Sequence, residues 1–395
     1  MEFWGYERPD GSVGIRNYVA VLPAGKCTNE MAVRIAEAAG PGVIPLPNNH
    51  QCVYLPPDKE RALRALVGLG RNPNVAATVI VGIGCEDVSV EALANGIAVS
   101  KKPLEVVTIE KEGSFQAVLD RAVLTSRRML SDVTAMKRLS FDLKHLTLAV
   151  KCGGSSGLSG LACNAVSGEA ANTIIEAGGS VIFSETAEII GAEEILAKRA
   201  VTKKVGQRIF EVSERLQTRF QNAGVDLTEG EPTPGNIKEG LTTMEEKSLG
   251  AIVKGGNHRL QDVLEWAERP QGKGLYFMDG SAATSQVYVG AAAAGAQIAT
   301  FNTGSGLMTS FRTFPGGRGV PILPVIKIAN KLVGTDRDYG DILLDSVING
   351  QESIAKAGQS LLAEIVNISS GKLAKMEMLP PYIEMLELSA LCPTI

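Results

Sequence analysis

Short apolar runs alternate with amphipathic stretches along most of the chain. Nine runs of strand length are rich in apolar residues, at positions 18–23, 42–46, 77–82, 104–109, 146–150, 180–183, 274–278, 296–301 and 324–328. Between them lie stretches with helical periodicity, including 29–39, 59–69, 115–131, 170–177 and 192–222. Nearly continuous apolar strands separated by amphipathic helices are typical of parallel sheets covered on both faces. The pattern therefore predicts an α/β fold with mainly parallel sheets flanked by helices.

The length of 395 residues exceeds what one hydrophobic core usually organises, so we expect two domains. A charged helical stretch gives way to a new strand near residues 142–145. We place an N-terminal α/β domain at 1–143, a C-terminal α/β domain at 144–370 and a tail at 371–395. Glycine and proline between Gly230 and Gly235 predict an extended loop inside the second domain.

Polar and glycine-rich residues follow nearly every predicted strand. They occupy positions 25–29, 48–52, 82–86, 152–156, 184–188, 279–281 and 302–304. Ligands of open α/β sheets bind at the carboxyl ends of the strands, where helix N-termini and loop amides meet. The pattern predicts an active-site cleft along those ends. Ordinary strand-to-helix turns have a similar composition, so this pattern alone leaves that interpretation open.

The charge balance and the length of the apolar stretches argue against nucleic acid and a membrane as partners. Lys and Arg number 39 against 43 for Asp and Glu, which gives a net charge of −4 without a concentrated basic patch. Nucleic acid is therefore not the expected partner. The longest stretch of small apolar residues, 287–294, is too short to span a bilayer. Six widely spaced cysteines fit reduced thiols in a cytoplasmic protein better than a disulfide framework.

Several familiar catalytic signatures are missing from the sequence. It has no Walker loop, no H-E-x-x-H and no C-x-x-C, and the Gly-Ile-Gly at 82–84 does not continue into a dinucleotide fingerprint. The segment 153–157 formally matches the G-x-S-x-G nucleophile elbow. Only His258 follows it as a base, so a serine hydrolase is the weaker interpretation.

The densest candidate for ligand binding is the segment 151–160, which contains four glycines and three serines after a predicted strand. Backbone N–H groups in such a turn suit a carboxylate or phosphate, although a plain flexible turn has the same composition. At another strand end, Glu185 and Glu188 could ligate a hard metal or act as acid and base. Glu188 also suits the N-terminus of a helix, where its charge would complement the helix dipole.

Other candidates have simpler structural explanations beside the functional ones. Thr243 and Glu246 match a capping box, which explains Glu246 but not the neighbouring Lys247. His50 follows a strand and could be a ligand or an acid/base group as readily as a structural histidine. Cys85 and Cys152 could ligate a soft metal, but small buried residues are common at strand ends.

An ordered set of segments resembles the altronate/galactarate dehydratase family of hydro-lyases. The segments are 5–18, 81–86, 152–160, 184–194, 234–250 and 277–279, and they are collinear across roughly residues 5–350. The resemblance implies a dehydratase that acts by β-elimination on a sugar acid such as altronate or a related polyhydroxy acid. It also implies a divalent metal, usually Fe²⁺ with Mn²⁺ as the alternative, which would hold substrate oxygens while a base removes the α-proton.

The resemblance also implies roles for individual residues. The catalytic group would be Glu185, His50 and Lys247. Metal ligands would be Cys85, Glu86 and Cys152. The substrate would be bound by Ser155, Ser159, Thr242, Thr243, Asp279 and Lys327.

Three departures from the family pattern leave the substrate open. Ser156 stands where family members commonly have Asp, Glu239 stands where they have Gly, and Leu343 stands where they have Asn. The alternatives are a sulfolactate sulfo-lyase large subunit and a non-catalytic paralogue that binds a small acid. Because the chain begins directly at the core motif, we expect a separate small subunit to carry the N-terminal β-rich domain of the single-chain dehydratases. The resemblance is also compatible with self-association into a homo-oligomer.

Overall fold

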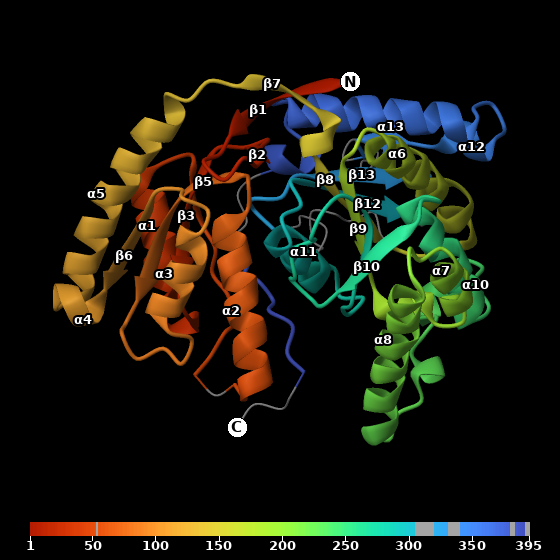
Figure 1. Cartoon of the computed structure of the whole chain (residues 1–395), viewed down its shortest axis with the longest axis horizontal. Coiled ribbons are helices and arrows are strands. Elements are labelled where there is room, and N and C mark those ends of the chain that lie inside the picture. Colours follow the sequence, from red (N-terminus) through yellow and green to blue (C-terminus); the bar gives the residue numbers. More distant parts are fainter. Residues whose placement is uncertain (53, 305–319, 331–339, 380–383, 392–395) are drawn as a thin grey trace.

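The computed structural model describes residues 1–52, 54–304, 320–330, 340–379 and 384–391. Two parallel sheets flanked by helices make up most of these residues, which confirms the α/β class (Figure 1). Each of the nine apolar runs overlaps an observed strand. No helix in the described part of the chain is long and apolar enough to cross a membrane.

The first sheet has four parallel strands in the order β4-β3-β5-β6. Alternate residues of its strands face two different helical layers: Val19 and Val21 pack with α1 and α5, whereas Ala20 and Leu22 pack with α2 and α3. This alternation follows from the strand period of two. The bounds are β3 (Tyr18–Pro23), β4 (Val43–Pro45), β5 (Val75–Gly82), β6 (Leu104–Thr108), α1 (Asn29–Ala39), α2 (Pro56–Arg71), α3 (Val90–Ala98), α4 (Ile109–Glu112) and α5 (Phe115–Thr134).

The second sheet has seven parallel strands in the order β10-β11-β9-β8-β12-β13-β14. Helices α6 and α13 contribute to the core on one face, and α11 packs on the other. The bounds are β8 (Thr147–Cys152), β9 (Ser180–Ser184), β10 (Leu260–Leu264), β11 (Gly274–Met278), β12 (Ile298–Thr303), β13 (Val325–Ala329), β14 (Ile342–Leu343), α6 (Ala165–Glu176), α11 (Thr284–Ala293), α12 (Asp345–Ile348) and α13 (Ile354–Ser369).

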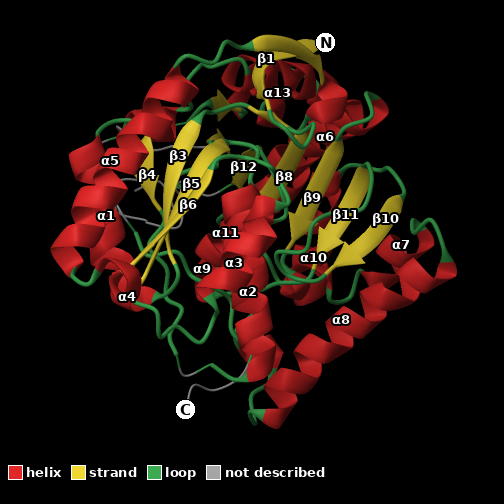
Figure 2. Cartoon of the chain, turned by 60° about the vertical axis from the view of Figure 1, so that its left-hand side comes forward, coloured by secondary structure: helices red, strands yellow, loops and turns green. Residues whose placement is uncertain are grey.

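Helices α2 and α11 lie between the two sheets and join them (Figure 2). One apolar cluster includes residues of both sheets and of both helices. The side-chain amide of Asn72, just after α2, donates to the carbonyls of Ala292 and Ala296 at 2.7 and 2.9 Å. The predicted domain boundary at 143/144 lies between the sheets and stays a prediction.

A third, antiparallel sheet was not predicted from the sequence. It has the order β2-β1-β7, with bounds β1 (Glu2–Glu7), β2 (Val13–Gly14) and β7 (Leu139–Asp142). The C-terminal tail contacts the segment just after β4, where the N–H of Leu386 donates to the carbonyl of Pro47 at 2.7 Å. The Pro380-Pro381 pair and Cys392 lie outside the described residues.

Two sequence predictions need correction. The stretch 192–222 is not one helix but two, α7 (Glu193–Lys198) and α8 (Lys203–Asn222), because Thr202 starts a new helix by accepting a hydrogen bond from the N–H of Val205. The loop expected at 230–235 leads directly into a short helix, α9 (Pro234–Lys238), with proline in its first turn. Helix α10 (Met244–Ile252) follows it.

Candidate active site

A buried ion cluster lies where β8 and β9 end. These strands are parallel neighbours, with Val150 paired to Phe183, so their carboxyl ends lie at the same edge of the sheet. The Lys151 Nζ donates to Glu185 Oε1 at 2.6 Å, and the N–H of Cys152 donates to Glu185 Oε2 at 3.1 Å. Glu185 is fully buried, so it depends on these partners to remain charged.

Lys254 joins Glu185 to a second carboxylate. It lies in the short helical turn 253–255 after α10 and is 1% exposed. Its Nζ lies 2.5 Å from Glu185 Oε2 and 2.6 Å from Glu188 Oε2. Glu188 is 3% exposed, and its Oε1 accepts a hydrogen bond from Ser155 Oγ at 3.3 Å. One buried ammonium group therefore bridges the two buried carboxylates.

The backbone at Glu185 has an unusual conformation. Its φ of 87° and ψ of 77° lie in the left-handed region, which side chains other than glycine rarely adopt. Two bonds between the next residue and Gly280 restrain it: the N–H of Thr186 donates to the carbonyl of Gly280 at 2.9 Å, and the N–H of Gly280 donates to Thr186 Oγ1 at 3.0 Å. Strain of this kind persists where the surroundings enforce it, and functional sites are common among such places.

The two carboxyl groups differ in their affinity for protons. Burial opposes ionisation of Glu185, but the charges of Lys151 and Lys254 outweigh it and lower the pKa of Glu185 to about 2. Burial and then the Glu185 charge raise the pKa of Glu188 above its ordinary value. Glu185 is therefore the lasting anion, and Glu188 is the carboxyl group that takes up a proton more readily.

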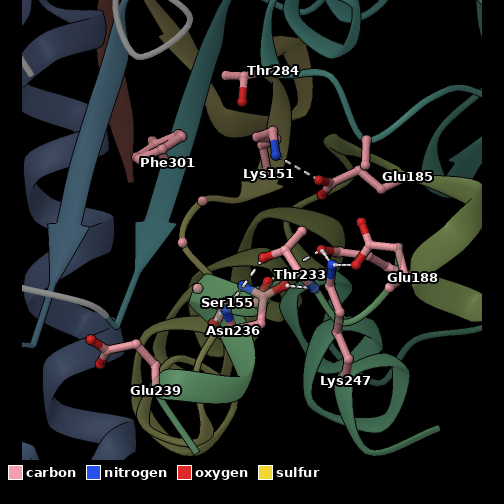
Figure 3. Close-up of a pocket in the computed structure, with 15 residues that line it drawn as sticks. Lys151, Ser155, Glu185, Glu188, Thr233, Asn236, Glu239, Lys247, Thr284 and Phe301 are labelled. Carbon is pink, nitrogen blue, oxygen red and sulfur yellow. Dashed lines mark hydrogen bonds and ion pairs between the residues drawn. The ribbon is translucent and has the colours of Figure 1, made fainter. Parts of the chain in front are cut away.

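A pocket of about 260 Å³ opens beside this cluster (Figure 3). Lys151, Ser155, Glu188 and Lys247 contribute polar groups to its lining, and Phe301 contributes an apolar wall. Gly153 is required here, because a Cβ atom would lie 2.5 Å from ring carbons of Phe301. The volume falls below the ~300 Å³ at the lower end for drug-sized ligands, so the pocket suits a small metabolite.

The segment 231–239 covers one side of the pocket. Asn236 Nδ2 donates to the carbonyl of Ser155 at 2.9 Å, and Lys247 Nζ donates to the carboxylate of Glu231. Lys247 also lies 3.9 Å from Glu188 Oε1. A second pocket of about 360 Å³ adjoins the first and shares Ser155 and Lys247 with it.

The structure brings several predicted site residues together at this edge. Ser155, Glu185 and Lys247 line the first pocket, and Cys152 and Ser159 line the second. Ser159 is engaged locally, because its hydroxyl donates to the carbonyl of Ser156 and accepts from the N–H of Ser156, both at 2.8 Å.

Other predicted substrate-binding residues have structural partners. Thr243 caps α10 by accepting from the N–H of Glu246 at 3.2 Å, and the Thr242 hydroxyl donates to the Glu246 carboxylate at 2.6 Å. Asp279 accepts from Thr186 Oγ1 and from Arg215, each at 2.5 Å. None of Thr242, Thr243 and Asp279 is among the described residues that line the two pockets.

Lys327 lies two strands away from Lys151 on the same row of the second sheet. The register pairs Lys151 with Phe301 and Phe301 with Lys327. Lys327 is fully buried, and its Nζ lies 5.8 Å from the centroid of the Phe301 ring. Within the described residues, Lys327 therefore packs against Phe301 and supports that wall of the pocket.

His50, Cys85 and Glu86 lie at the carboxyl edge of the first sheet. His50 Nε2 lies 2.8 Å from Asp87 Oδ1, and the Glu86 carboxylate accepts from the N–H of Ile83 and Gly84 at 2.5 and 2.9 Å. Cys85 is exposed. These three residues are not among the described residues lining the two pockets beside Glu185.

The residues that the structure describes do not form a site for a metal ion. Among the described residues, no three His, Cys, Asp or Glu side chains converge so that they could hold a metal ion. The predicted ligand set of Cys85, Glu86 and Cys152 is therefore not assembled, and the oxygens of Glu185 and Glu188 face ammonium groups instead. Fe²⁺ or Mn²⁺ dependence stays a prediction.

Comparisons with known proteins identify the family. The family model described as D-galactarate/altronate dehydratase, C-terminal, matches residues 143–386, and that described as D-galactarate dehydratase/altronate hydrolase, second domain, matches residues 5–134. The chain therefore belongs to the D-galactarate/altronate dehydratase family, which confirms the resemblance seen in its motifs.

The relatives found are lyases of two kinds. The (2R)-sulfolactate sulfo-lyase subunit beta of Chromohalobacter salexigens is 35% identical, and the match covers 95% of each chain. The galactarate dehydratase (L-threo-forming) of Escherichia coli is 30% identical over 94% of this chain and 73% of its own length. The altronate dehydratase of Bacillus subtilis is 30% identical over 83% of this chain and 65% of its own length. Lyase is accordingly the class of enzyme to which this chain is assigned.

Proposed function

We propose that this chain is the large subunit of a lyase that carries out β-elimination on a small 2-hydroxy acid, with water as the leaving group. The observation that carries the proposal is the unequal pair of buried carboxyl groups beside a small pocket. Glu185 is held ionised by Lys151 and Lys254, while Glu188 lines the pocket with a raised pKa. Pairs of titratable groups with separated pKa values are a common mark of acid/base sites.

The geometry supports a division of roles among the cluster residues. Lys151 supplies a positive charge for the substrate carboxylate, which becomes more negative when the neighbouring carbon loses its proton. The Glu188 carboxylate takes that α-proton, the electron pair forms the Cα=Cβ bond, and the β C–O bond breaks. The departing hydroxide takes this proton from Glu188 and leaves as water, which restores the carboxylate, and the enol product tautomerises to a 2-keto acid. Glu185 acts through Lys151 and Lys254 and is a positioning residue in this scheme.

Elimination of sulfite is the second candidate. The similarity to a sulfo-lyase subunit extends over 95% of both chains, which favours a β-sulfonate as an alternative leaving group. A non-catalytic paralogue is less well supported, because the buried carboxyl groups of Glu185 and Glu188 and their lysine partners are all present beside the pocket. Ser156, in place of the expected Asp, keeps a structural role: its hydroxyl accepts from the N–H of Ser159 at 3.1 Å.

A small partner subunit belongs to the proposal. The similar sulfo-lyase chain is named subunit beta, and the two dehydratases are longer than the part that this chain matches. We propose that a small β-rich protein completes the enzyme and helps to exclude water from the pocket. We also propose a cytoplasmic location, which the five free thiols of the described residues support. Self-association stays a prediction.

Turnover of defined acids tests the proposed reaction. The chain should be coexpressed with a small β-rich protein encoded beside it and assayed with altronate, galactarate and sulfolactate. We expect a 2-keto acid from one of the hydroxy acids, or sulfite and pyruvate from sulfolactate, detected by mass spectrometry. Absence of any elimination product with all three acids, from a correctly folded complex, would contradict the proposal.

Metal dependence is a separate prediction. Treatment with a chelator under reducing conditions should abolish turnover, and added Fe²⁺ should restore it, with Mn²⁺ as the second choice. The measurement is the initial rate before and after metal addition, with Mg²⁺ as a control for ionic strength. Undiminished turnover after exhaustive chelation, together with no metal by elemental analysis, would exclude a metal requirement.

A further inference from the structure

A carboxylate of the protein itself is paired with a cationic side chain of the pocket. The Glu231 carboxylate accepts a hydrogen bond from Lys247 Nζ, and both residues line the first pocket, in which Figure 3 labels Lys247. The Lys247 side chain is 7% exposed. Burial opposes its charge, but Glu188 and Glu231 outweigh burial and raise the pKa of Lys247. Lys247 is therefore a lasting ammonium group that holds a carboxylate inside the pocket.

The charges of the cluster limit what the pocket can accept. Three ammonium groups, those of Lys151, Lys247 and Lys254, face three carboxylates, those of Glu185, Glu188 and Glu231. With Glu188 ionised as the base, these charges cancel, so a bound monoanion gives the cluster a net charge of −1 and a bound dianion gives −2. Burying a second uncompensated charge is costly. If one carboxylate leaves the cluster, the dianion is buried with the same net charge as a monoanion.

Glu231 is the carboxylate best placed to leave. Glu185 and Glu188 are 0% and 3% exposed and are both held by Lys254, whereas the Glu231 side chain is 18% exposed. Glu231 also lies just before α9 in the segment that covers the pocket. Its carboxylate can therefore turn toward water without disrupting the sheet.

We propose that Lys247 is a subsite for the second anionic group of a dianionic substrate, and that Glu231 occupies this subsite until the substrate displaces it. The inference rests on the proposed function and narrows its substrate to small acids with two anionic groups. A distal carboxylate and a sulfonate share the required chemistry. Glu231 and Lys247 thus determine specificity, while Lys151 and Glu188 serve the reacting end.

Binding of unreactive acids tests this proposal without requiring turnover. The dissociation constants of succinate, 3-sulfopropanoate and butyrate should be measured by titration calorimetry on the complete enzyme. In Glu231→Gln, the preference for a dianion over butyrate should increase about tenfold or more, because a like charge at the subsite has been removed. Lys247→Met should abolish the preference. The dianion whose affinity increases more identifies the distal group as carboxylate or sulfonate.

Glu239→Gln is the matched control. Glu239 lines the same pocket and is partly exposed, as Glu231 is, but among the described residues it is Glu231 whose carboxylate pairs with Lys247. Substitution of Glu239 therefore removes one charge without freeing Lys247. An unchanged preference in Glu231→Gln, or an equal increase in Glu239→Gln, would overturn the proposal. Because the probes cannot undergo elimination, this result is independent of whether the elimination assay succeeds.

Discussion

Glu185→Gln should unfold at a markedly lower urea concentration than the wild-type chain. Removal of one partner from a buried ion pair typically costs about 3–5 kcal/mol, since the remaining charge is left without compensation. Here the substitution would leave Lys151 without its carboxylate and Lys254 with Glu188 alone. A position at the end of a strand does not by itself predict such a loss of stability, whereas the full burial of Glu185 does.

The stability difference should depend on pH in a defined direction. The pKa of Glu185 is lowered from 4.5 to about 2 in the folded chain, so its stabilising contribution is present above the unfolded value and is lost as pH falls toward 2. Urea unfolding at pH 7, 5 and 3.5 should show the gap between wild type and variant narrowing only at the lowest pH.

An exposed ion pair provides the control for this substitution. Glu194 pairs with Lys198 one helical turn away, and both side chains are about three-quarters exposed. Glu194→Gln should change the free energy of unfolding by less than about 1 kcal/mol. Equal stability of the Glu185 and Glu194 variants at pH 7 would show that the buried cluster does not hold the site together.

The parallel strands could be predicted because burial on both faces leaves a continuous apolar run. The strands that were missed lack that signal. Strand β10 lies at the sheet edge and includes Gln261 and Asp262, which interrupt the run. Strands β1 and β7 pair across more than 130 residues, and alternation in such short segments does not identify a partner.

The candidate site could be predicted only in part. Position after a strand was enough to select Ser155 and Glu185. The roles of Lys151 and Lys254 were missed. Each lysine directly follows an apolar stretch, and a lysine that is buried at such a place needs a carboxylate partner. Their shared partner Glu185 is 34 and 69 residues away, so only the fold reveals the pairing. The same criterion also selected His50, which lies at the end of a strand in the other sheet. The sequence alone does not show which strand ends line the same pocket.

Glu188→Gln should lower the rate of elimination by about 10²–10⁴-fold, the usual contribution of a positioned acid/base group. The substitution preserves the size of the side chain and an oxygen that can accept from Lys254. Glu185 remains to balance the buried ammonium groups. The free energy of unfolding should therefore fall less than in Glu185→Gln. A large loss of rate with a small loss of stability would separate the proton carrier from the positioning residue.

The pH dependence of the rate provides the second measurement. Burial and the Glu185 charge raise the pKa of Glu188, so a smaller fraction of the base is ionised at low pH. The kcat/KM of the wild-type enzyme should rise with pH through the raised pKa of Glu188, and the residual activity of Glu188→Gln should lack that rise. If the variant keeps the same acidic limb, or if it retains wild-type turnover while folded, another group removes the proton and Glu188 serves only to hold Lys254 and Ser155.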